Sequence, residues 1–197
     1  MRDIYIYKID SNDVIYMVSG NWQEFVKENN GLENTNSNNV IGKPLWNFIN
    51  GMETAHLYQI VLKAVRESKH GVKLFFRCDS PDTRRYLQLA IIPLEDSCIE
   101  FRSQIIKTES RESPDILRNG IERSDDIITM CSMCKKINTL HNAWEEIELA
   151  INILKLLEME HPPRISHGLC PSCFNSMMDE VKLIQRGTLD NPASRNA

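Results

Sequence analysis

Four cysteines toward the end of the chain are the residues best suited to carry chemistry. They form two pairs with the same spacing, Cys131-Ser-Met-Cys134 and Cys170-Pro-Ser-Cys173. Two thiolates separated by two residues can occupy adjacent corners of a tetrahedron around one soft cation, and two such pairs complete the four-sulfur shell that Zn²⁺ favours. The pairs therefore predict a structural zinc site with these four cysteines as ligands. Because a closed shell leaves no open position for a water molecule, the pattern favours scaffolding over catalysis.

The second pair lies where a helix is expected to begin. Small residues in the segment 166–169 suit a tight turn, and residues 174–181 read as a helix. A cysteine in the first turn of a helix meets the positive end of the helix dipole, which favours the thiolate. A first pair in a turn and a second pair opening a helix is the plan of a treble-clef zinc site. Lys135 and Lys136 are expected to balance its negative charge.

Other uses of these cysteines stay open. Two disulfides would need an oxidising compartment, and no apolar signal segment opens the chain. Redox-active thiols, an iron–sulfur cluster or another metal are the remaining alternatives. His141 or His167 could replace a cysteine as ligand, although four sulfurs already fill the shell. The six cysteines indicate a reducing cytoplasm, with Cys78 and Cys98 as small buried or half-buried residues within strands.

The composition describes a soluble protein without an obvious catalytic domain. The chain has 197 residues, 42% of them hydrophobic and 25% charged, and a net charge of −4 that gives no reason to expect general nucleic-acid binding. No apolar run approaches the roughly 20 residues that span a bilayer. The nucleophile-elbow, phosphate-loop and H-E-x-x-H motifs are absent from the sequence. The length also leaves no room for a histidine-kinase or cyclic-dinucleotide synthesis domain, so we expect no enzyme.

Before the cysteines, the sequence alternates between strand and helix patterns. Polar turn formers at 10–13 separate two strand-like runs, and apolar residues at helical spacing predict a helix over 53–68. The expected elements in order are strands at 4–9 and 14–18, a helix near 22–26, a loop over 28–39, a helical turn opened by Pro44, the helix 53–68, and three antiparallel strands after Gly71.

This element order is that of a PAS domain. Four short sequence segments support the match: Val18-Ser19-Gly20-Asn21-Trp22, Ile41-Gly42-Lys43-Pro44-Leu45-Trp46, Thr54-Ala55-His56-Leu57-Tyr58 and Phe76-Arg77-Cys78-Asp79-Ser80-Pro81. The sequence resembles bacterial PAS-domain proteins in which the sensor is followed by a Cys-x-x-Cys-Lys-Lys segment and a Ser-His-Gly-x-Cys-Pro-x-Cys segment. Residues 131–137 and 166–173 match those two motifs. The resemblance implies a signalling or regulatory role, because PAS domains usually sense small molecules, light or redox state, or mediate dimerisation.

The expected fold class is α+β, with a PAS-like antiparallel sheet and flanking helices followed by a small helical zinc-binding module. We divide the chain into a sensor over 1–108, a linker helix over 109–126, a zinc module over 127–188 and a disordered tail over 189–197. Within the module, an apolar stripe over 144–157 predicts a helix that forms its small core, or else a partner or dimer surface. Metal binding is expected to contribute much of the module's folding free energy.

A PAS-like cavity would be lined by large apolar side chains, namely Trp22, Phe25, Trp46, Phe48, Leu74 and Phe76. The alternative is that these side chains fill a solid core, and the identity of any small-molecule ligand stays open. His56 and His70 could serve as haem ligands in such a cavity, but their positions among polar neighbours and in a turn favour solvated side chains. The basic side chains of Arg77, Arg84 and Arg85 could bind an anion or a partner, but charged residues at strand edges and turns are usually solvated, and we expect that here.

Three functional hypotheses follow. The first is a cytoplasmic signalling protein whose PAS sensor is coupled to a structural zinc module that mediates homodimerisation or binding of a protein partner. The second is a zinc-dependent transcription regulator contacting DNA through Lys135, Lys136, Arg164 and Arg186, which the acidic net charge does not favour. The third is a redox switch in which oxidation of the cysteines expels zinc. No membrane association is expected.

Overall fold

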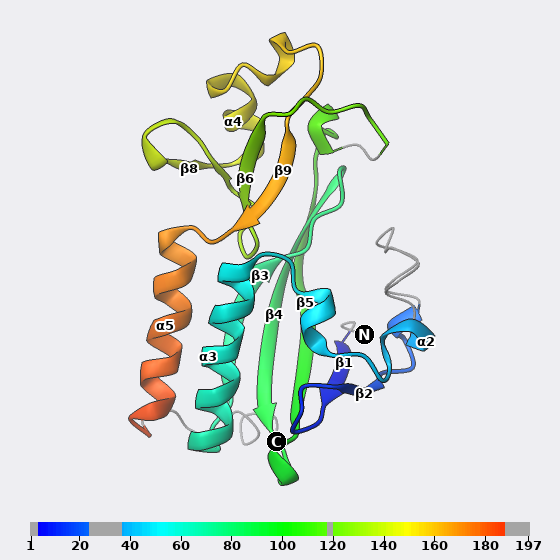
Figure 1. Ribbon diagram of the computed structural model, residues 1–197, viewed down its shortest axis with the longest axis vertical. Helices are drawn as coiled ribbons and strands as arrows, with labels where there is room; N and C mark the ends of the chain where they lie inside the picture. The colour runs from blue at the N-terminus through cyan, green and yellow to red at the C-terminus, as the bar shows by residue number, and fades with distance from the viewer. Residues whose placement is uncertain (1–3, 24–36, 118–119, 188–197) are drawn as a thin grey trace.

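A computed structural model describes residues 4–23, 37–117 and 120–187 and shows an α+β molecule (Figure 1). Its first sheet is antiparallel and has five strands in the order β2-β1-β5-β4-β3. The strands are β1 (Ile4–Ile9), β2 (Ile15–Val18), β3 (Val72–Arg77), β4 (Thr83–Pro93) and β5 (Ile99–Ser110). This sheet and its flanking helices confirm the predicted PAS-like fold class.

The register of the central strands follows from their alternating pattern. In the β4–β5 pair, Ile91 lies opposite Phe101, and both side chains are fully buried. On the other face, Glu100 forms ion pairs with Lys8 at 3.2 Å and Arg102 at 2.6 Å. A strand that places apolar side chains on one face and paired charges on the other fixes its own register, because a slip of one residue would exchange the faces.

The connection from β2 to β3 carries the helices of the sensor. These are α2 (Ser37–Val40), the 3-10 helix η2 (Leu45–Phe48) and α3 (Met52–Ser68). The positions of η2 and α3 agree with the predicted Pro44-opened turn and the predicted helix over 53–68, whereas α2 begins inside the predicted loop over 28–39 and corrects it. Leu57, Val61 and Val65 lie on one face of α3 and are buried against the sheet side of the core. Trp22 and Gln23 are helical, in agreement with the predicted helix near 22–26. The rest of that helix and residues 28–36 of the predicted loop over 28–39 lie outside the described residues.

The carboxyl-terminal part contains a second sheet besides its helices. Its four strands have the order β8-β7-β6-β9. The elements are β6 (Ile127–Cys131), β7 (Ile137–Asn138), the 3-10 helix η5 (Leu140–Asn142), β8 (Trp144–Glu145), α4 (Ile147–Ile153), the 3-10 helix η6 (Leu156–Glu158), β9 (Arg164–Gly168) and α5 (Pro171–Gln185). β6 and β9 pair in parallel, with Cys131 opposite Gly168.

Helix α5 lies alongside α3 and also contacts β3 (Figure 1). Met177, Val181 and Ile184 of α5 are buried in the same apolar cluster as the inner face of α3. A second, smaller cluster lies under α4 and consists of Ile116, Met130, Ile137, Ile147, Ala150 and Leu156. The main core therefore runs from the first sheet into the second part of the chain, and the division at residue 127 stays a prediction.

The structure corrects two predicted helices, the linker over 109–126 and the apolar stripe over 144–157. In place of the linker helix over 109–126, the described residues contain the end of β5 and a short 3-10 helix, η4 (Asp115–Leu117). Pairing of Thr83 with Ser110 extends β5, and Pro114 then disfavours helix for the residue before it. The stripe over 144–157 forms α4 only over Ile147–Ile153, because Trp144 joins β8 and Lys155 takes a left-handed conformation with φ of 51°. The predicted tail over 189–197 lies outside the described residues.

Candidate metal centre

The four predicted ligand cysteines come together at one point. The sulfur atoms of Cys131, Cys134, Cys170 and Cys173 all lie within 4.8 Å of one another, and all are free thiols. Cys131 and Cys170 are buried, whereas Cys134 and Cys173 are half-buried. Within the described residues, neither His141 nor His167 belongs to this cluster.

The spacing of the sulfurs fits a tetrahedral metal ion. With metal–sulfur bonds of about 2.3 Å, the edge of a regular tetrahedron of sulfurs is about 3.8 Å. The Cys134 and Cys170 sulfurs are 3.7 Å apart. This separation is far longer than the roughly 2.05 Å bond of a disulfide. The chemistry of the donor set therefore suits Zn²⁺ or an iron centre, the ions that take four thiolates in this geometry.

Hydrogen bonds between the thiols shift the pKa values of three of the four cysteines, in opposite directions. The Cys134 and Cys173 thiols donate to the Cys131 sulfur, which lowers the pKa of Cys131 well below its usual value. The same bonds raise the pKa of Cys134 and of Cys173, because each loses a partner when it gives up its proton. A metal-free cluster thus favours a single thiolate, whereas a bound divalent cation would stabilise all four.

The β6–β9 pairing, the turn after Cys131 and the start of α5 bring the two cysteine pairs together. The parallel pairing of β6 with β9 places Cys131 opposite Gly168, two residues before Cys170. After Cys131 the chain turns tightly, and the Lys135 amide donates to the Cys131 carbonyl at 3.0 Å. Cys170 is the N-cap of α5, with its sulfur accepting from the Cys173 amide at 3.4 Å. Pro171 at the first helical position suits this start, since its missing N–H has no partner there anyway.

Three hydrogen bonds attach the metal turns to the sensor. The Arg77 amide on β3 donates to the Met133 carbonyl at 2.7 Å. The Thr54 hydroxyl on α3 donates to the Ser132 hydroxyl at 2.8 Å, and the Leu169 amide donates to the Glu53 carboxylate at 3.2 Å. Both cysteine turns are therefore held by the edge strand and the first turn of α3.

A network of charged side chains makes a second attachment. Arg77 is 5% exposed and contacts Asp79 and Glu146, with the Glu146 contact at 2.7 Å. Arg111 lies 3.5 Å from Asp79 and 3.6 Å from Glu148. Burial alone would lower the pKa of the Arg77 guanidinium, but its hydrogen bonds to Asp79 and Glu146 raise it. The prediction that Arg77 is solvated is therefore wrong, because its side chain pairs with Asp79, two residues along the chain, and with Glu146, the N-cap of α4.

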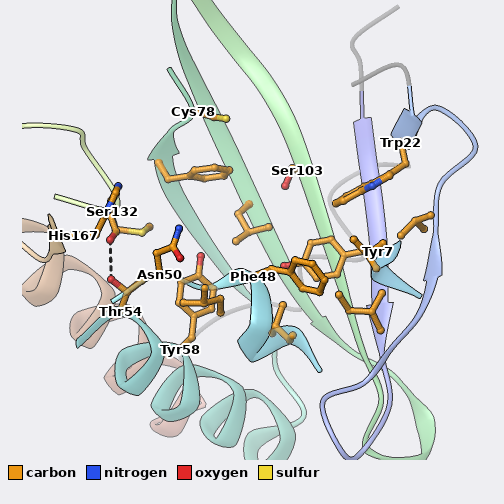
Figure 2. Close-up of a pocket in the computed structure, with 18 of the residues that line it drawn as sticks. Tyr7, Trp22, Phe48, Asn50, Thr54, Tyr58, Cys78, Ser103, Ser132 and His167 are labelled. Carbon is orange, nitrogen blue, oxygen red and sulfur yellow. Dashed lines mark hydrogen bonds between the residues drawn. The ribbon is translucent and has the colours of Figure 1, made fainter. Parts of the chain in front are cut away.

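The sensor contains a cavity of about 490 Å³ that reaches the first cysteine turn (Figure 2). Trp22, Phe48 and Phe76 line it as predicted, whereas Trp46 and Leu74 do not, and Phe25 lies outside the described residues. The sequence did not identify the contributions of Ser132, Met133, Lys135 and His167, which come from the metal-binding part. Their only sequence signal was proximity to the cysteines.

The remaining sequence candidates do not belong to the cysteine cluster, and of them Cys78 lines the cavity (Figure 2). His56 is exposed on α3, and the His70 ring nitrogen lies 2.7 Å from the Ser68 carbonyl; neither lines the described cavity. Cys78 and Cys98 are half-buried, each just outside a strand, and burial raises the pKa of Cys78. The basic residues proposed for DNA contact do not form one patch, since Arg164 begins β9 and Arg186 follows the last turn of α5.

Comparisons with known proteins give little further guidance. No protein-family model and no curated protein matches the chain. Among solved structures, a domain of an HTR-like protein from Haloarcula marismortui is similar at 15% identity and a TM-score of 0.37, over 53% of this chain and 98% of that chain. A match this weak carries no argument about function. No helix in the described ranges is long and apolar enough to cross a membrane.

Proposed function

We propose that this chain is a cytoplasmic bacterial signalling protein in which a PAS-like sensor is coupled to a structural zinc site. The observation that carries the proposal is the position of the first cysteine turn. Its residue Met133 hydrogen-bonds to the edge strand β3 and also lines the sensor cavity. A structural change in the cavity would therefore act directly on the turn proposed to hold the metal.

The role proposed for the metal is to hold β6, β9 and α5 together. Four thiolates fill a tetrahedral shell, so the ion would have no position for a substrate. Without the ion, the four clustered thiols would be joined only by weak hydrogen bonds between sulfur atoms, such as the 3.7 Å contact of Cys134 with Cys170. The proposed role of the metal is therefore structural rather than catalytic.

The output proposed for the chain is homodimerisation or binding of a protein partner through the metal-binding part. Several large apolar side chains on and after α4 support this, because they are exposed in the single chain: Leu149, Ile153, Leu157 and Met159. Leu157 alone is 74% exposed. Exposed apolar side chains gathered in one segment commonly mark interaction sites.

The experiment that tests the proposal is metal analysis by plasma mass spectrometry on protein purified without added metal, combined with the molar mass from light scattering. We expect one zinc per chain and a dimeric mass. The double variant Cys170→Ser, Cys173→Ser should lose the zinc and melt at a lower temperature. Cys98→Ser is the matched control, because this half-buried cysteine lies outside the cluster. Full metal retention in the double variant would refute the zinc site, and iron with visible absorbance would replace it by an iron–sulfur centre.

A further inference from the structure

The cavity between the first sheet and the first cysteine turn is large enough for a small organic ligand. Its volume of about 490 Å³ lies within the usual range of ligand pockets, roughly 300–1,000 Å³. At about 30 Å³ per molecule it would hold on the order of 16 waters. A molecule with one or two fused rings and a polar group would fill such a space.

The two ends of the cavity differ in chemistry (Figure 2). At one end lie Tyr7 and Trp22, whose rings meet edge to face with centroids 5.9 Å apart, and Phe48 lies between the ends. At the other end lie Asn50, Thr54, Ser132 and His167. Aromatic walls favour a flat apolar body, because offset and edge-to-face ring contacts stabilise it beyond simple burial.

The polar end is rich in donors and contains a cation. Lys135 lines the cavity, and its ammonium group has three N–H donors, one of which the Ser132 carbonyl accepts at 2.8 Å. The Ser132 hydroxyl accepts from Thr54 at 2.8 Å, so its own proton is directed elsewhere. None of the described residues that line the cavity is Asp or Glu. The polar end is therefore suited to an anionic acceptor.

We propose that this cavity binds a small aromatic acid, with its ring system against Tyr7, Trp22 and Phe48 and its carboxylate toward Lys135, Asn50 and Ser132. The inference rests on the proposed sensor function and names the chemical class that the sensor takes. Because Ser132, Met133 and Lys135 belong to the metal turn, such a ligand touches that turn directly. Ligand binding and metal binding should then favour each other, since each stabilises the same turn.

The test is isothermal titration of the zinc-loaded chain of 197 residues with naphthalene-2-carboxylate and, separately, with naphthalene-2-carboxamide. The two probes share the ring system and differ in charge. We expect the carboxylate to bind at least about ten-fold more tightly, as for gain of a hydrogen bond between charged groups. Absence of carboxylate binding, or equal affinity for the two probes, would overturn the inference.

Paired variants locate the site. Lys135→Met should weaken carboxylate binding about ten-fold and leave the carboxamide within about two-fold. Lys136→Met is its matched control, because it removes the same charge from the neighbouring residue, which does not line the described cavity. An equal loss in both variants would mean only long-range attraction and would reject the proposed anchor.

A second pair keeps the test valid if Lys135→Met does not fold or loses zinc. Phe48→Ala should weaken binding of both probes at least about five-fold, because it removes ring contacts at the aromatic wall. Phe75→Ala is the control, since Phe75 is 64% exposed on β3 and does not line this cavity. Unchanged binding by Phe48→Ala would place the probe elsewhere. Zinc content and molar mass are measured independently. A protein that binds zinc and dimerises but does not bind the carboxylate would therefore refute the ligand inference and leave the proposed function standing.

Discussion

At the residue scale, the backbone of Gly51 decides how closely α3 approaches β9. Gly51 is the N-cap of α3 and has φ of 88°, a value that side chains of L-residues rarely adopt. A Cβ placed there would lie 2.9 Å from the carbonyl oxygen of His167. That carbonyl is backbone and cannot rotate away as a side chain could. The glycine therefore allows α3 to reach the metal turns, where Glu53 and Thr54 make their hydrogen bonds.

Replacement of this glycine by alanine should distinguish the cost of the positive φ from the cost of the close approach to the His167 carbonyl. We expect Gly51→Ala to lower the free energy of unfolding by about 1–3 kcal/mol, because both the dihedral and the close approach become unfavourable. Gly42→Ala is the matched control: its φ is 79°, but a Cβ there meets nothing within 4 Å, so it should cost only about 1 kcal/mol. Urea unfolding measures both. Equal losses would show that the contact with His167 contributes nothing.

At the scale of elements, the ion network joins the β3–β4 hairpin to the start of α4. Arg77 and Asp79 belong to the sensor, whereas Glu146 and Glu148 arrive from the metal-binding part, 69 residues further along for the Arg77–Glu146 pair. Removing one partner of a buried ion pair leaves the other charge desolvated, which costs more than the pair contributes. The network therefore fixes the relative placement of these elements.

This argument predicts a large effect of Arg77→Met. The free energy of unfolding should fall by roughly 3 kcal/mol, because Asp79 and Glu146 lose their shared buried partner. Lys63→Met should change it by less than about 0.5 kcal/mol, since the Lys63–Glu67 pair is 3.9 Å long and both side chains are mostly exposed. The two variants are compared by their urea midpoints at an unchanged m-value. Similar losses in both would show that burial of the network has no energetic consequence.

At the scale of the whole molecule, the cysteine turns belong to the main apolar core. Buried side chains of α3 and α5 form one apolar cluster, and the same cluster contains Cys131, Met133 and Cys170. Loss of the metal would release the two turns that begin this packing. Because α3 also closes the cavity of the sensor, the consequences should extend across the main core.

Chelation of the metal should therefore destabilise the sensor as well. We expect the melting temperature to fall by at least about 10 °C, because structural zinc contributes a large folding free energy. Amide hydrogen exchange should lose protection in α3 as well as in α5. The variant Cys170→Ser, Cys173→Ser serves as control, because the chelator should not change it further. Full protection of α3 after chelation would show that the two parts fold independently.

The sequence by itself determined the features that depend on neighbouring residues. The spacing of Cys131, Cys134, Cys170 and Cys173 predicted the metal cluster, since each pair is local and its chemistry follows from the thiol. Alternating and helical periods likewise predicted the sensor strands and α3, because those periods reflect which face of each element is buried. The linker helix over 109–126 was wrong because strand pairing, which is not local, extends β5 to Ser110.

Only the tertiary structure decided how these parts meet. The pairing of β6 with β9, the contact of Leu169 with Glu53 across 116 residues and the burial of Arg77 all join segments that lie far apart in the chain. No local pattern marks such partners, because each side chain alone is compatible with solvent. The cavity wall formed by Ser132, Met133 and Lys135 has the same origin, since it exists only where the metal turn packs against the sensor.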